Sequence, residues 1–592
     1  MEEEKMVDHY SDNSEITQQQ NSSKRAKGGL VTLPFIIANE AFEKVASYGL
    51  IQNMILYLIK DYHIGVAKST NILFFWSAAT NFTPIVGAFV SDTFLGRFLT
   101  IGLGSLSSLM GTILLWLTAM IPEARPPACD IMTGQICTKA TAGQRAMLLG
   151  SFALISAGAG GVRPCSIAFG ADQLYDKTDP KNKRVMERFF NWYYASAAIS
   201  VLVAFTGIVY IQDRLGWKVG FGVPAIFMFC SAMLFFVASP LYLKYKSSKS
   251  LLTGFAQVIV AAYRNREVPF PSEDNSYHTR KDSDVTRPTY TLRFLNKACI
   301  VKDREQDIAA DGSSASNPWR LCTIDQVEEL KALIKVIPIW STGIMLSINT
   351  SQNTFPVLQA GSMDRHVTSG FKIPAASYSM FTVLALALWV ILYDRAVLPL
   401  ASKVRGKPVR LGVKLRMGIG LFLSFLAMVV SATVESTRRR RAISEGLSNN
   451  PLAVVNMSAM WLVPQYCLHG FAEAFFAIGQ TEFYYAEFPK SMASIAAAMF
   501  GLGMAVANLL ASLILSIVDK TTSGGSGGSW VSNNINDGHY DRYYWLLAIM
   551  SAINFPYFLI CIWAYGPCKQ QVASFRHEEE ELKQDDGLPM KV

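Results

Sequence analysis

Long apolar runs separated by short polar stretches recur along this sequence. Residues 101–121, 219–239, 375–392 and 411–433 each give 18 or more mostly apolar positions in a row. A helix of about 20 apolar residues crosses a bilayer whose hydrocarbon core is about 30 Å thick. The pattern therefore predicts a membrane protein in which many helices span the bilayer.

The spacing of these runs predicts an all-α membrane protein with twelve transmembrane helices. Six precede a long polar stretch and six follow it, as expected for two six-helix bundles joined by a linker. Such halves are typical of the major facilitator fold, in which substrate binds near the membrane midplane between them. We expect spans at residues 33–59, 70–92, 98–120, 145–170, 189–212, 218–243, 331–354, 375–398, 411–434, 457–480, 491–517 and 542–565.

The same pattern divides the chain into five parts. Basic residues just before the first span hold the N-terminus in the cytoplasm by the positive-inside rule. An amphipathic piece at 251–263 is expected along the membrane surface, and Arg438–Arg441 is expected in an outer loop, against that rule. We expect a cytoplasmic N-terminal tail at 1–32, an N-terminal bundle at 33–243, a cytoplasmic linker at 244–328, a C-terminal bundle at 329–566 and a cytoplasmic C-terminal tail at 567–592.

Composition agrees with this topology and narrows the function. Of the 592 residues, 17% are charged, whereas soluble domains carry about 25%. The net charge of +9 is interpreted as cytoplasmic anchoring, and because no soluble segment interleaves basic with aromatic residues, we expect no nucleic-acid partner. The seven histidines lack metal-ligand spacing, and neither a Ser-His-Asp set nor a phosphate-binding loop appears. We therefore expect a secondary transporter without a cofactor, not an enzyme or an ATP-driven pump.

The strongest functional signal lies in the first span. Glu40, Glu43 and Lys44 are three or four residues apart, so they project from one side of a helix. Each ionisable group at mid-membrane costs about 2.5–3.5 kcal/mol, and a helix facing lipid would not tolerate three. A charge cluster at a helix end is the alternative, but these residues lie well inside the apolar run. Because a buried carboxyl group beside a lysine is suited to carry a proton, we assign the group to proton coupling.

Two further spans carry isolated ionisable groups. Arg163, in the fourth span, stays protonated at physiological pH and offers a fixed positive charge to an anionic substrate or to a carboxylate of the first span. A purely structural ion pair is the alternative. Glu473, in the tenth span, stands among apolar residues and is a candidate for proton or substrate gating. Its alternative role is a bond to a neighbouring helix.

Polar side chains also gather in the outer half of the seventh span. Residues 349–354 are six consecutive hydroxyl and amide residues, which is too polar for a helix face that contacts lipid. We expect Thr350, Asn353 and Thr354 to line a substrate cavity, with an interfacial helix end as the alternative. Tyr48 of the first span completes the candidate substrate-binding set.

Three residues in or near loops bear on folding and regulation. Cys129 and Cys137 share the loop after the third span, on the predicted exoplasmic side, where a disulfide and two free thiols are both open. Thr100 follows Arg97 by three residues. It is a candidate for phosphorylation by a basic-directed kinase, or simply one threonine among many.

Several of these segments together resemble one family, the proton-dependent oligopeptide transporters, and in particular its plant nitrate/peptide transporters. The pattern Glu40-x-x-Glu43-Lys44 resembles the Glu-x-x-Glu-Arg/Lys motif of that family. The resemblance covers residues from about 28 to 566. Its other segments are Gly87–Arg97, Gly160–Pro164, Phe169–Gln173, Cys322–Glu329, Ile337–Trp340, Glu473 and Ile478–Gln480.

The resemblance implies a major facilitator fold and proton symport by alternating access, with the proton gradient as the energy source. It makes Glu40, Glu43 and Lys44 the proton-coupling group. Arg163 occupies the place of a family lysine that pairs with them, and Thr100 that of a regulatory phosphothreonine. The solutes it implies are nitrate, peptides, hormones or glucosides.

This sequence departs from the family pattern at the implied substrate site. Thr350 stands where the family has a nitrate-contacting histidine, whereas Thr354 matches a hydroxyl of the same pocket. In the fifth span Ala198 replaces a family asparagine. These changes leave the mechanism intact and the substrate open.

Three hypotheses follow for the function. The leading one is proton-coupled uptake of nitrate, drawn to Arg163 and Lys44. The second is uptake of a peptide, of a plant hormone such as auxin, gibberellin or abscisic acid, or of a glucoside. The third is a transporter-like sensor. We expect an integral plasma-membrane protein with cytoplasmic termini, whose partners are lipid, protons, a small-molecule or inorganic anion and a regulatory kinase; the sequence carries no indication of oligomeric state.

Overall fold

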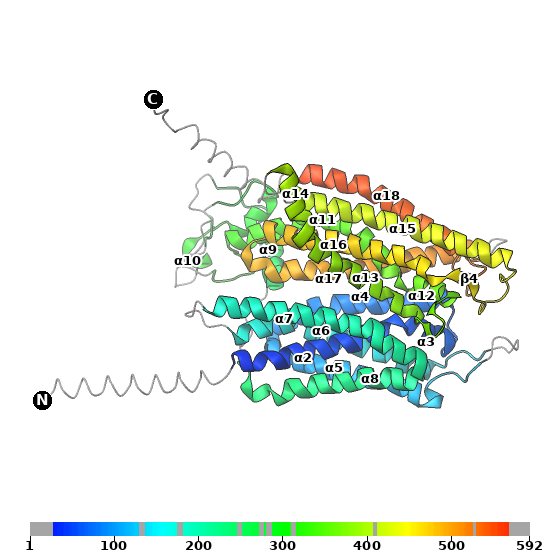
Figure 1. Cartoon of the computed structure of the whole chain (residues 1–592). Helices are drawn as coiled ribbons and strands as arrows, with labels where there is room; N and C mark the ends of the chain where they lie inside the picture. Colours follow the sequence, from blue (N-terminus) through cyan, green and yellow to red (C-terminus); the bar gives the residue numbers. More distant parts are fainter. Residues whose placement is uncertain are drawn as a thin grey trace, which may run out of the picture. The chain divides into compact units, whose positions relative to one another are not determined.

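Helices form nearly all of the regular structure in the computed structural model (Figure 1). The described residues form two compact units, one reaching position 248 and including Val367–Met380, the other holding 249–366 and the chain from 381 onward. The expected linker thus groups with the second unit instead of standing apart. The structure describes residues 28–129, 137–174, 181–244, 251–271, 277–279, 287–308, 315–406, 411–524 and 528–566.

The first unit is built from long helices joined by short turns. Two of the short helical segments, η2 and η5, are π-helical, a form that often marks functional sites. Its elements are η1 (Leu30–Thr32), α2 (Leu33–Gln52), α3 (Met54–Lys60), α4 (Val66–Val90), η2 (Ser91–Leu95), α5 (Gly96–Met120), η3 (Pro122–Ala124), α6 (Ala142–Gln173), α7 (Lys181–Val203), η5 (Ala204–Ile208), α8 (Val209–Val237) and η6 (Ser239–Leu241), with β2 (His366–Thr368, divided by the unit boundary), β3 (Phe371–Lys372) and η10 (Ala375–Ser379) from later in the chain.

The second unit holds the linker elements and the remaining long helices. Two-residue β1 (Met363–Asp364) pairs in parallel with β4 (Val455–Ser458). The helical elements are α9 (Leu251–Arg264), η8 (Arg293–Cys299), α10 (Arg304–Asp307), α11 (Ile324–Thr350), η9 (Ser351–Asn353), α12 (Thr354–Gly361), α13 (Met380–Leu392), η11 (Tyr393–Val397), α14 (Leu398–Arg405), α15 (Val413–Ser444), η12 (Ala459–Leu462), α16 (Val463–Glu487), η13 (Lys490–Met492), α17 (Ala493–Thr522) and α18 (Tyr540–Tyr565).

Eight segments of the described chain are long and apolar enough to cross a membrane, judged by length and composition. Two of these, Val66–Met120 and Val185–Leu241, each contain two helices. The chain turns within them at Gly96 and Gly216, where φ is 74° and 76°, a conformation that glycine adopts readily. Helices α2 and α16 are more polar than these eight segments. In α2 this is due to the three charges singled out above. With these two, the described helices account for the twelve predicted spans.

Small residues let the helices of the first unit approach closely. A Cβ atom added to Gly161 of α6 would lie 2.6 Å from the carbonyl oxygen of Thr100 on α5. One added to Gly158 would lie 1.9 Å from Ser108 Oγ. Without a hydrophobic driving force between helices in lipid, such close backbone packing is a main source of helix association. It fixes α6, and with it Arg163, against α5.

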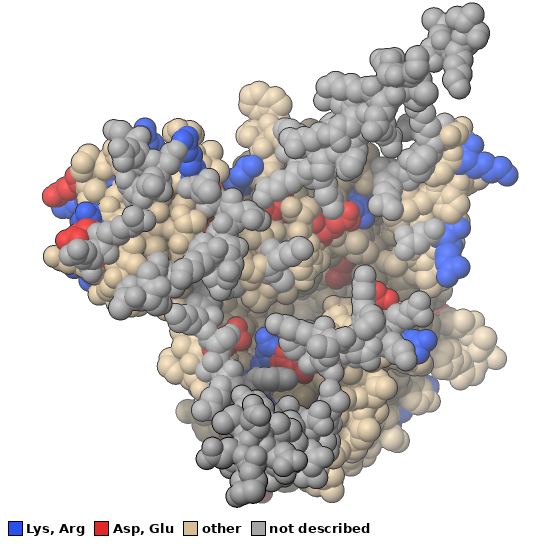
Figure 2. All heavy atoms as spheres, turned by 90° about the vertical axis from the view of Figure 1, so that its left-hand side faces the viewer, with Lys and Arg blue, Asp and Glu red and all other residues tan. Residues whose placement is uncertain are grey.

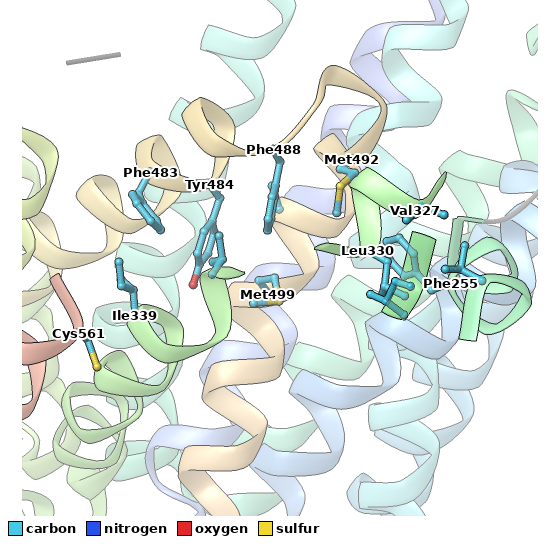
Figure 3. Packing of buried hydrophobic residues seen from close by; sticks show 14 of the residues in the cluster. Phe255, Val327, Leu330, Ile339, Phe483, Tyr484, Phe488, Met492, Met499 and Cys561 are labelled. Carbon is cyan, nitrogen blue, oxygen red and sulfur yellow. The ribbon is translucent and has the colours of Figure 1, made fainter. Parts of the chain in front are cut away.

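The linker packs its apolar face on protein. Phe255, Val258 and Ala262 of α9 belong to one buried cluster with Val327 and Leu330 at the start of α11, part of which is seen in Figure 3. The apolar side of this amphipathic helix thus packs in part on α11 and η8, while its expected place along the membrane surface stays a prediction. Burial raises the pKa of the Cys299 and Cys322 thiols in this region to about 12.

Two boundaries differ from prediction for local reasons. The tenth span begins at Val463, not at 457, because residues 455–458 form strand β4. The four arginines expected in an outer loop continue helix α15, which ends at Ser444. Arg438 can be inside the protein because it pairs with the equally buried Glu435, at 2.8 Å. Figure 2 shows one face of the molecule, on which blue Lys and Arg and red Asp and Glu side chains lie scattered among other residues.

Candidate functional site

Helix α2 carries the first ion pair of the candidate site. Lys44 Nζ lies 3.0 Å from Glu40 Oε1, one helical turn away. The Glu40 side chain is only 2% exposed, and its other oxygen, Oε2, is buried without a hydrogen bond from any described residue. A buried carboxylate is tolerated when a cation compensates it. The remaining oxygen is an acceptor available to a proton.

A second ion pair joins α2 to α6. Arg163 Nη2 lies 3.8 Å from Glu43 Oε1, and the Glu43 side chain is fully buried. Ser47, one turn further along α2, donates a hydrogen bond of 2.6 Å to the same oxygen. Arg163 Nε and Glu43 Oε2 are both buried without hydrogen-bond partners among the described residues. The long ion-pair distance and the unused donor leave Arg163 capable of binding a further anion.

Tyr48 lies beside both cations. Its ring centre is 5.9 Å from Lys44 Nζ and 5.7 Å from Arg163 Cζ, within the range of cation–π attraction. The structure thus brings together the five proton-coupling and substrate-binding candidates of the first unit: Glu40, Glu43, Lys44, Tyr48 and Arg163.

Neighbouring helices hold α2 in register. Asn39 donates a 2.8 Å hydrogen bond to Ser231 Oγ of α8, and the Ser231 hydroxyl returns one of 2.8 Å to the carbonyl oxygen of Asn39. Buried reciprocal bonds of this kind fix the rotation of a helix about its axis, since any turn breaks both. Glu40 and Glu43 are therefore held at defined positions.

The polar residues of the seventh predicted span surround a break in the helix. Helix α11 ends at Thr350 and α12 begins at Thr354, with the short η9 between them. The Thr350 hydroxyl donates to the Leu346 carbonyl at 3.1 Å, whereas Thr354 Oγ1 is buried without a described partner. Asn353 lines a small cavity. Discontinuous membrane helices commonly form substrate sites because their free backbone ends are polar.

Glu473 lies on α16 of the second unit. The carboxylate is half-buried, and no hydrogen bond or ion pair joins it to another residue in the ranges that the structure covers. The alternative role of Glu473, a bond to a neighbouring helix, therefore has no support in that part of the chain. Glu482, nearer the end of α16, forms an ion pair with Arg416 of α15.

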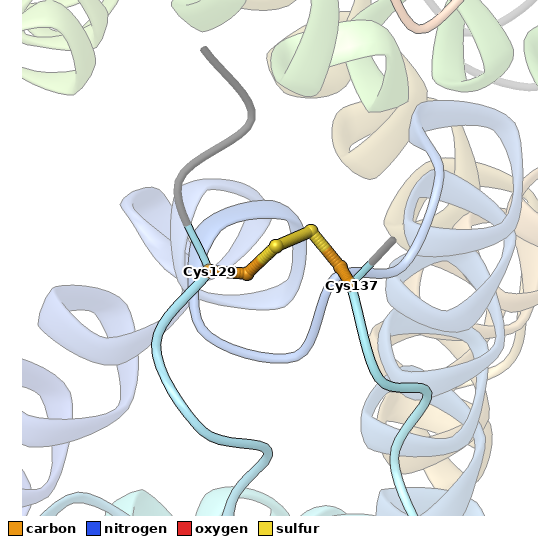
Figure 4. Close-up of a disulfide and its surroundings, with 2 residues drawn as sticks. All are labelled: Cys129 and Cys137. Carbon is orange, nitrogen blue, oxygen red and sulfur yellow. A yellow bond between two sulfur atoms is a disulfide. The ribbon is translucent and has the colours of Figure 1, made fainter. Parts of the chain in front are cut away.

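The candidate regulatory threonine and the loop cysteines lie away from the ion pairs. Thr100 is only 5% exposed, and its hydroxyl donates to the Gly96 carbonyl at 2.9 Å, so a kinase could reach it only after α5 moves. Cys129 and Cys137 form a disulfide (Figure 4). A nitrogen of His63 and both sulfurs lie within 4.8 Å of one another. Because thiolates and not disulfides ligate metals, this cluster holds no metal while the disulfide is intact.

Comparison with known proteins gives the family. The model of the POT family matches residues 98–531, well over half of the chain. This chain belongs to the POT family. Protein NRT1/PTR FAMILY 1.2 of Arabidopsis thaliana is 64% identical over 95% of both chains, and Protein NRT1/PTR FAMILY 1.1 of the same plant is 60% identical over 96% of this chain and 98% of that one.

Solved POT family structures share the fold. The crystal structure of an auto inhibited POT family peptide transporter matches with a TM-score of 0.63 at 20% identity, covering 88% of this chain and 96% of that one. The POT family transporter PepTSo also gives 0.63, at 17% identity, over 90% and 99%. The chain is therefore an integral membrane transporter with the fold predicted from its sequence, and not an enzyme.

Several residues that complete this POT family site were not predicted. Ser47 and Asn39 have ordinary local signals, since Ser47 is four residues after Glu43 and Asn39 adjoins Glu40. The partner of Asn39 is 192 positions away in sequence, and no sequence period reveals such a contact. His469, four residues before Glu473, has no metal-ligand spacing to another histidine, so the sequence gives it no signal beyond its place one turn from a carboxyl group.

Proposed function

We propose that this POT family member is a proton-coupled symporter that takes up a small anionic solute, with nitrate the first candidate, across the plasma membrane. Alternating access, cytoplasmic termini and the absence of any cofactor are part of the proposal. The observation that carries it is the pair of buried carboxylates, Glu40 and Glu43, each beside one cation and each with one unbonded oxygen.

This arrangement links proton binding to anion binding. While Glu43 is ionised, its charge neutralises much of the field of Arg163 across 3.8 Å. A proton bound to Glu43 removes that compensation and leaves a buried guanidinium that favours an anion. Loss of the anion then favours loss of the proton. Two charges thus enter and leave together, which is the requirement for symport.

Glu40 and Lys44 form a second ion pair of the same kind. With the proton on Glu40, Lys44 is freed, and Tyr48 offers its ring face to either cation. We assign Thr350, Asn353 and Thr354 to solute contact from the second unit, and Glu473 to gating.

The second candidate is an organic solute. A peptide, plant hormone or glucoside would use the same cation through a carboxylate or phosphate, and the departure at Thr350 from the family's nitrate-contacting residue favours it. A sensor that binds solute without moving it is the third. All three share the ion-pair chemistry and differ in cargo or turnover.

The test is a solute panel in oocytes that express the full chain. Nitrate, alanyl-alanine, auxin, gibberellin, abscisic acid and a glucoside are applied at acid and neutral external pH, and current and uptake are measured. We expect an acid-stimulated nitrate current that falls at least about 10-fold in Glu40→Gln and Glu43→Gln. Glu123→Gln, an exposed glutamate of η3, is the matched control and keeps the wild-type current.

The outcomes separate the candidates. Acid-stimulated uptake of an organic solute with no nitrate current would replace the cargo and keep the mechanism. Solute binding without uptake would favour the sensor. Uptake that is the same at both pH values, and unchanged in both variants, would refute proton coupling.

A further inference from the structure

The second unit contains a small, mostly polar cavity, lined by residues of α11, η9, α12, α15, α16 and α18. Its lining includes Asn349, Gln465, Tyr466, His469 and Tyr544. About 10 Å³ is open to the centre of a water molecule, which is room for about one water. All of its walls come from this one unit.

Polar atoms of this cavity lack partners. Gln465 is 1% exposed, and neither its Nε2 nor its Oε1 is bonded to a described residue. Asn349 donates to Ser424 at 2.9 Å and to Ser551 at 2.8 Å, but its Oδ1 has no described donor. A buried polar group without a hydrogen bond costs free energy, so such atoms normally face a bound water or another hydrogen-bonding partner. Gln465 and Asn349 together suit a water that both donates and accepts.

His469 joins this cavity to Glu473. The two residues are four apart on α16, and Gln465 is four before His469, so all three lie on one side of the helix, one turn apart. Nδ1 of His469 is buried and has no partner among the described residues. Neutral imidazole has one acceptor nitrogen and one donor, which lets it take a proton at one atom and give it up at the other.

In the described part of the chain, no ion pair or hydrogen bond joins His469 to a residue of another helix. Tyr466 of α16 and Tyr544 of α18 are the other titratable groups of the cavity. The charges of α15 are engaged elsewhere, Arg438 with Glu435 and Arg416 with Glu482. The charged residues of α11 lie in its first half, up to Lys335, those of α17 in its last turn and those of α18 in its first turn, and α13 has none. Glu473 is thus the ionisable carboxyl group nearest to His469 along their shared helix face.

We propose that His469 is a second proton-binding residue of the transporter, and that it passes protons between the cavity and Glu473. In the first step a protonated water in the cavity gives its extra proton to the neutral imidazole and is left as neutral water. The imidazolium then releases a proton to the Glu473 carboxylate, which becomes a neutral carboxyl group. No covalent bond other than those to the moving proton changes, and charge is conserved at each step. The role in transport rests on the proposed function, whereas proton binding by His469 does not.

The first experiment measures nitrate-driven proton influx in proteoliposomes that contain the full chain and a trapped pH dye. His469→Gln keeps a donor and an acceptor but binds no proton. We expect the rise in rate between about pH 7.5 and about pH 5.5 to shrink at least ~3-fold in this variant. His366→Gln, the same change at an exposed histidine, is the matched control and keeps the wild-type profile. A wild-type profile in a folded His469→Gln variant would overturn the proposal.

The second experiment needs no solute. Nitrogen NMR of the intact chain, labelled at histidine, follows each ring through a pH titration, and the His469 signal is the one missing from His469→Gln. We expect it to titrate, with a midpoint that moves by ~0.5 pH unit or more in Glu473→Gln because a group one turn away no longer ionises. A His469 signal that does not titrate, or whose midpoint is the same in Glu473→Gln, would overturn the proposal.

The two experiments also separate this proposal from the proposed function. If wild-type proteoliposomes show no coupled proton influx with nitrate or any solute of the panel, the proposed function fails, while the NMR titration still decides whether His469 binds protons. If influx is coupled and the NMR midpoint is insensitive to Glu473→Gln, only the role of His469 fails. If His469→Gln does not fold, the His469 signal is assigned from a second variant, His469→Asn, and the comparison of wild type with Glu473→Gln is made in the same way.

Discussion

At the scale of single residues, this transporter concentrates its charges in matched pairs. Glu43 is fully buried, and it is compensated by one guanidinium at 3.8 Å and one hydroxyl at 2.6 Å. The distance is too long for a strong bond, so the pair is held together chiefly by charge. In the proposed coupling, a proton on Glu43 would remove this attraction, whereas removal of Arg163 alone would leave a buried charge without its partner.

The ion pair between Glu43 and Arg163 predicts a specific pattern of stability. Arg163→Ala leaves a buried carboxylate without its cation and is expected to destabilise the protein by about 3 kcal/mol. Glu43→Gln combined with Arg163→Ala removes both charges and should recover most of that loss. Unfolding of the purified chain in sodium dodecyl sulfate measures both variants. Equal stability of the single and the double variant would contradict the pairing.

At the scale of elements, close helix contacts position the site. Helix α6 brings Arg163 to α2 because glycines along it admit the backbone of α5. The Thr100 carbonyl is the atom nearest to Gly161, so the candidate phosphorylation site and the Arg163 helix share one contact. Movement that exposes Thr100 therefore also loosens the support of Arg163.

A single methyl group tests this contact. Gly161→Ala places a Cβ 2.6 Å from the Thr100 carbonyl oxygen and is expected to cost about 1–3 kcal/mol, with reduced transport. Gly143→Ala, near the start of the same helix with nothing within 4 Å, is the control and is expected to be neutral. Thermal unfolding and uptake are measured for both. A Gly161→Ala protein as stable as the control would show that α5 and α6 pack differently.

At the scale of the whole molecule, buried charge also ties distant parts of the chain together. Arg438 of α15 donates to Asn536 Oδ1 at 2.7 Å, to the Ile535 carbonyl at 2.7 Å and to Ser362 Oγ at 3.2 Å. Gln359 of α12 donates to Glu435 at 2.7 Å. This network joins segments more than 170 positions apart, at one end of the second unit.

Loss of the Arg438 network is expected to lower the stability of the whole second unit. Arg438→Met leaves Glu435 as an uncompensated buried charge, and a loss of about 3–5 kcal/mol is expected. Glu435→Gln combined with Arg438→Met removes the charge and should be closer to wild type. Detergent unfolding and yield of folded protein measure the difference. Full stability of Arg438→Met would refute the structural role assigned to this pair.

The sequence predicted the helices and their charged faces better than it predicted which side chains of different helices contact each other. Charges at positions 40, 43 and 44 could be assigned to one helix face because three- and four-residue spacing is a local property. That Arg163 reaches Glu43 follows from packing between helices more than 100 positions apart in sequence, which no local spacing encodes. The same limit explains the error at Arg438: four consecutive arginines predict exposure unless the buried Glu435 and its neighbours are known.

By itself the sequence determined the membrane-spanning helices, their number and the charged face of α2, because each depends on composition or on the helical period. Its motifs, by their resemblance to known proteins, indicated the family. Only the tertiary structure decided which carboxylate each cation compensates, that α9 covers protein, that Thr100 is enclosed, and that His469 and Gln465 face a shared cavity. These outcomes depend on close approach between helices distant in sequence. The physical reason is that burial and pairing are properties of packed surfaces, whereas periodicity is a property of one helix.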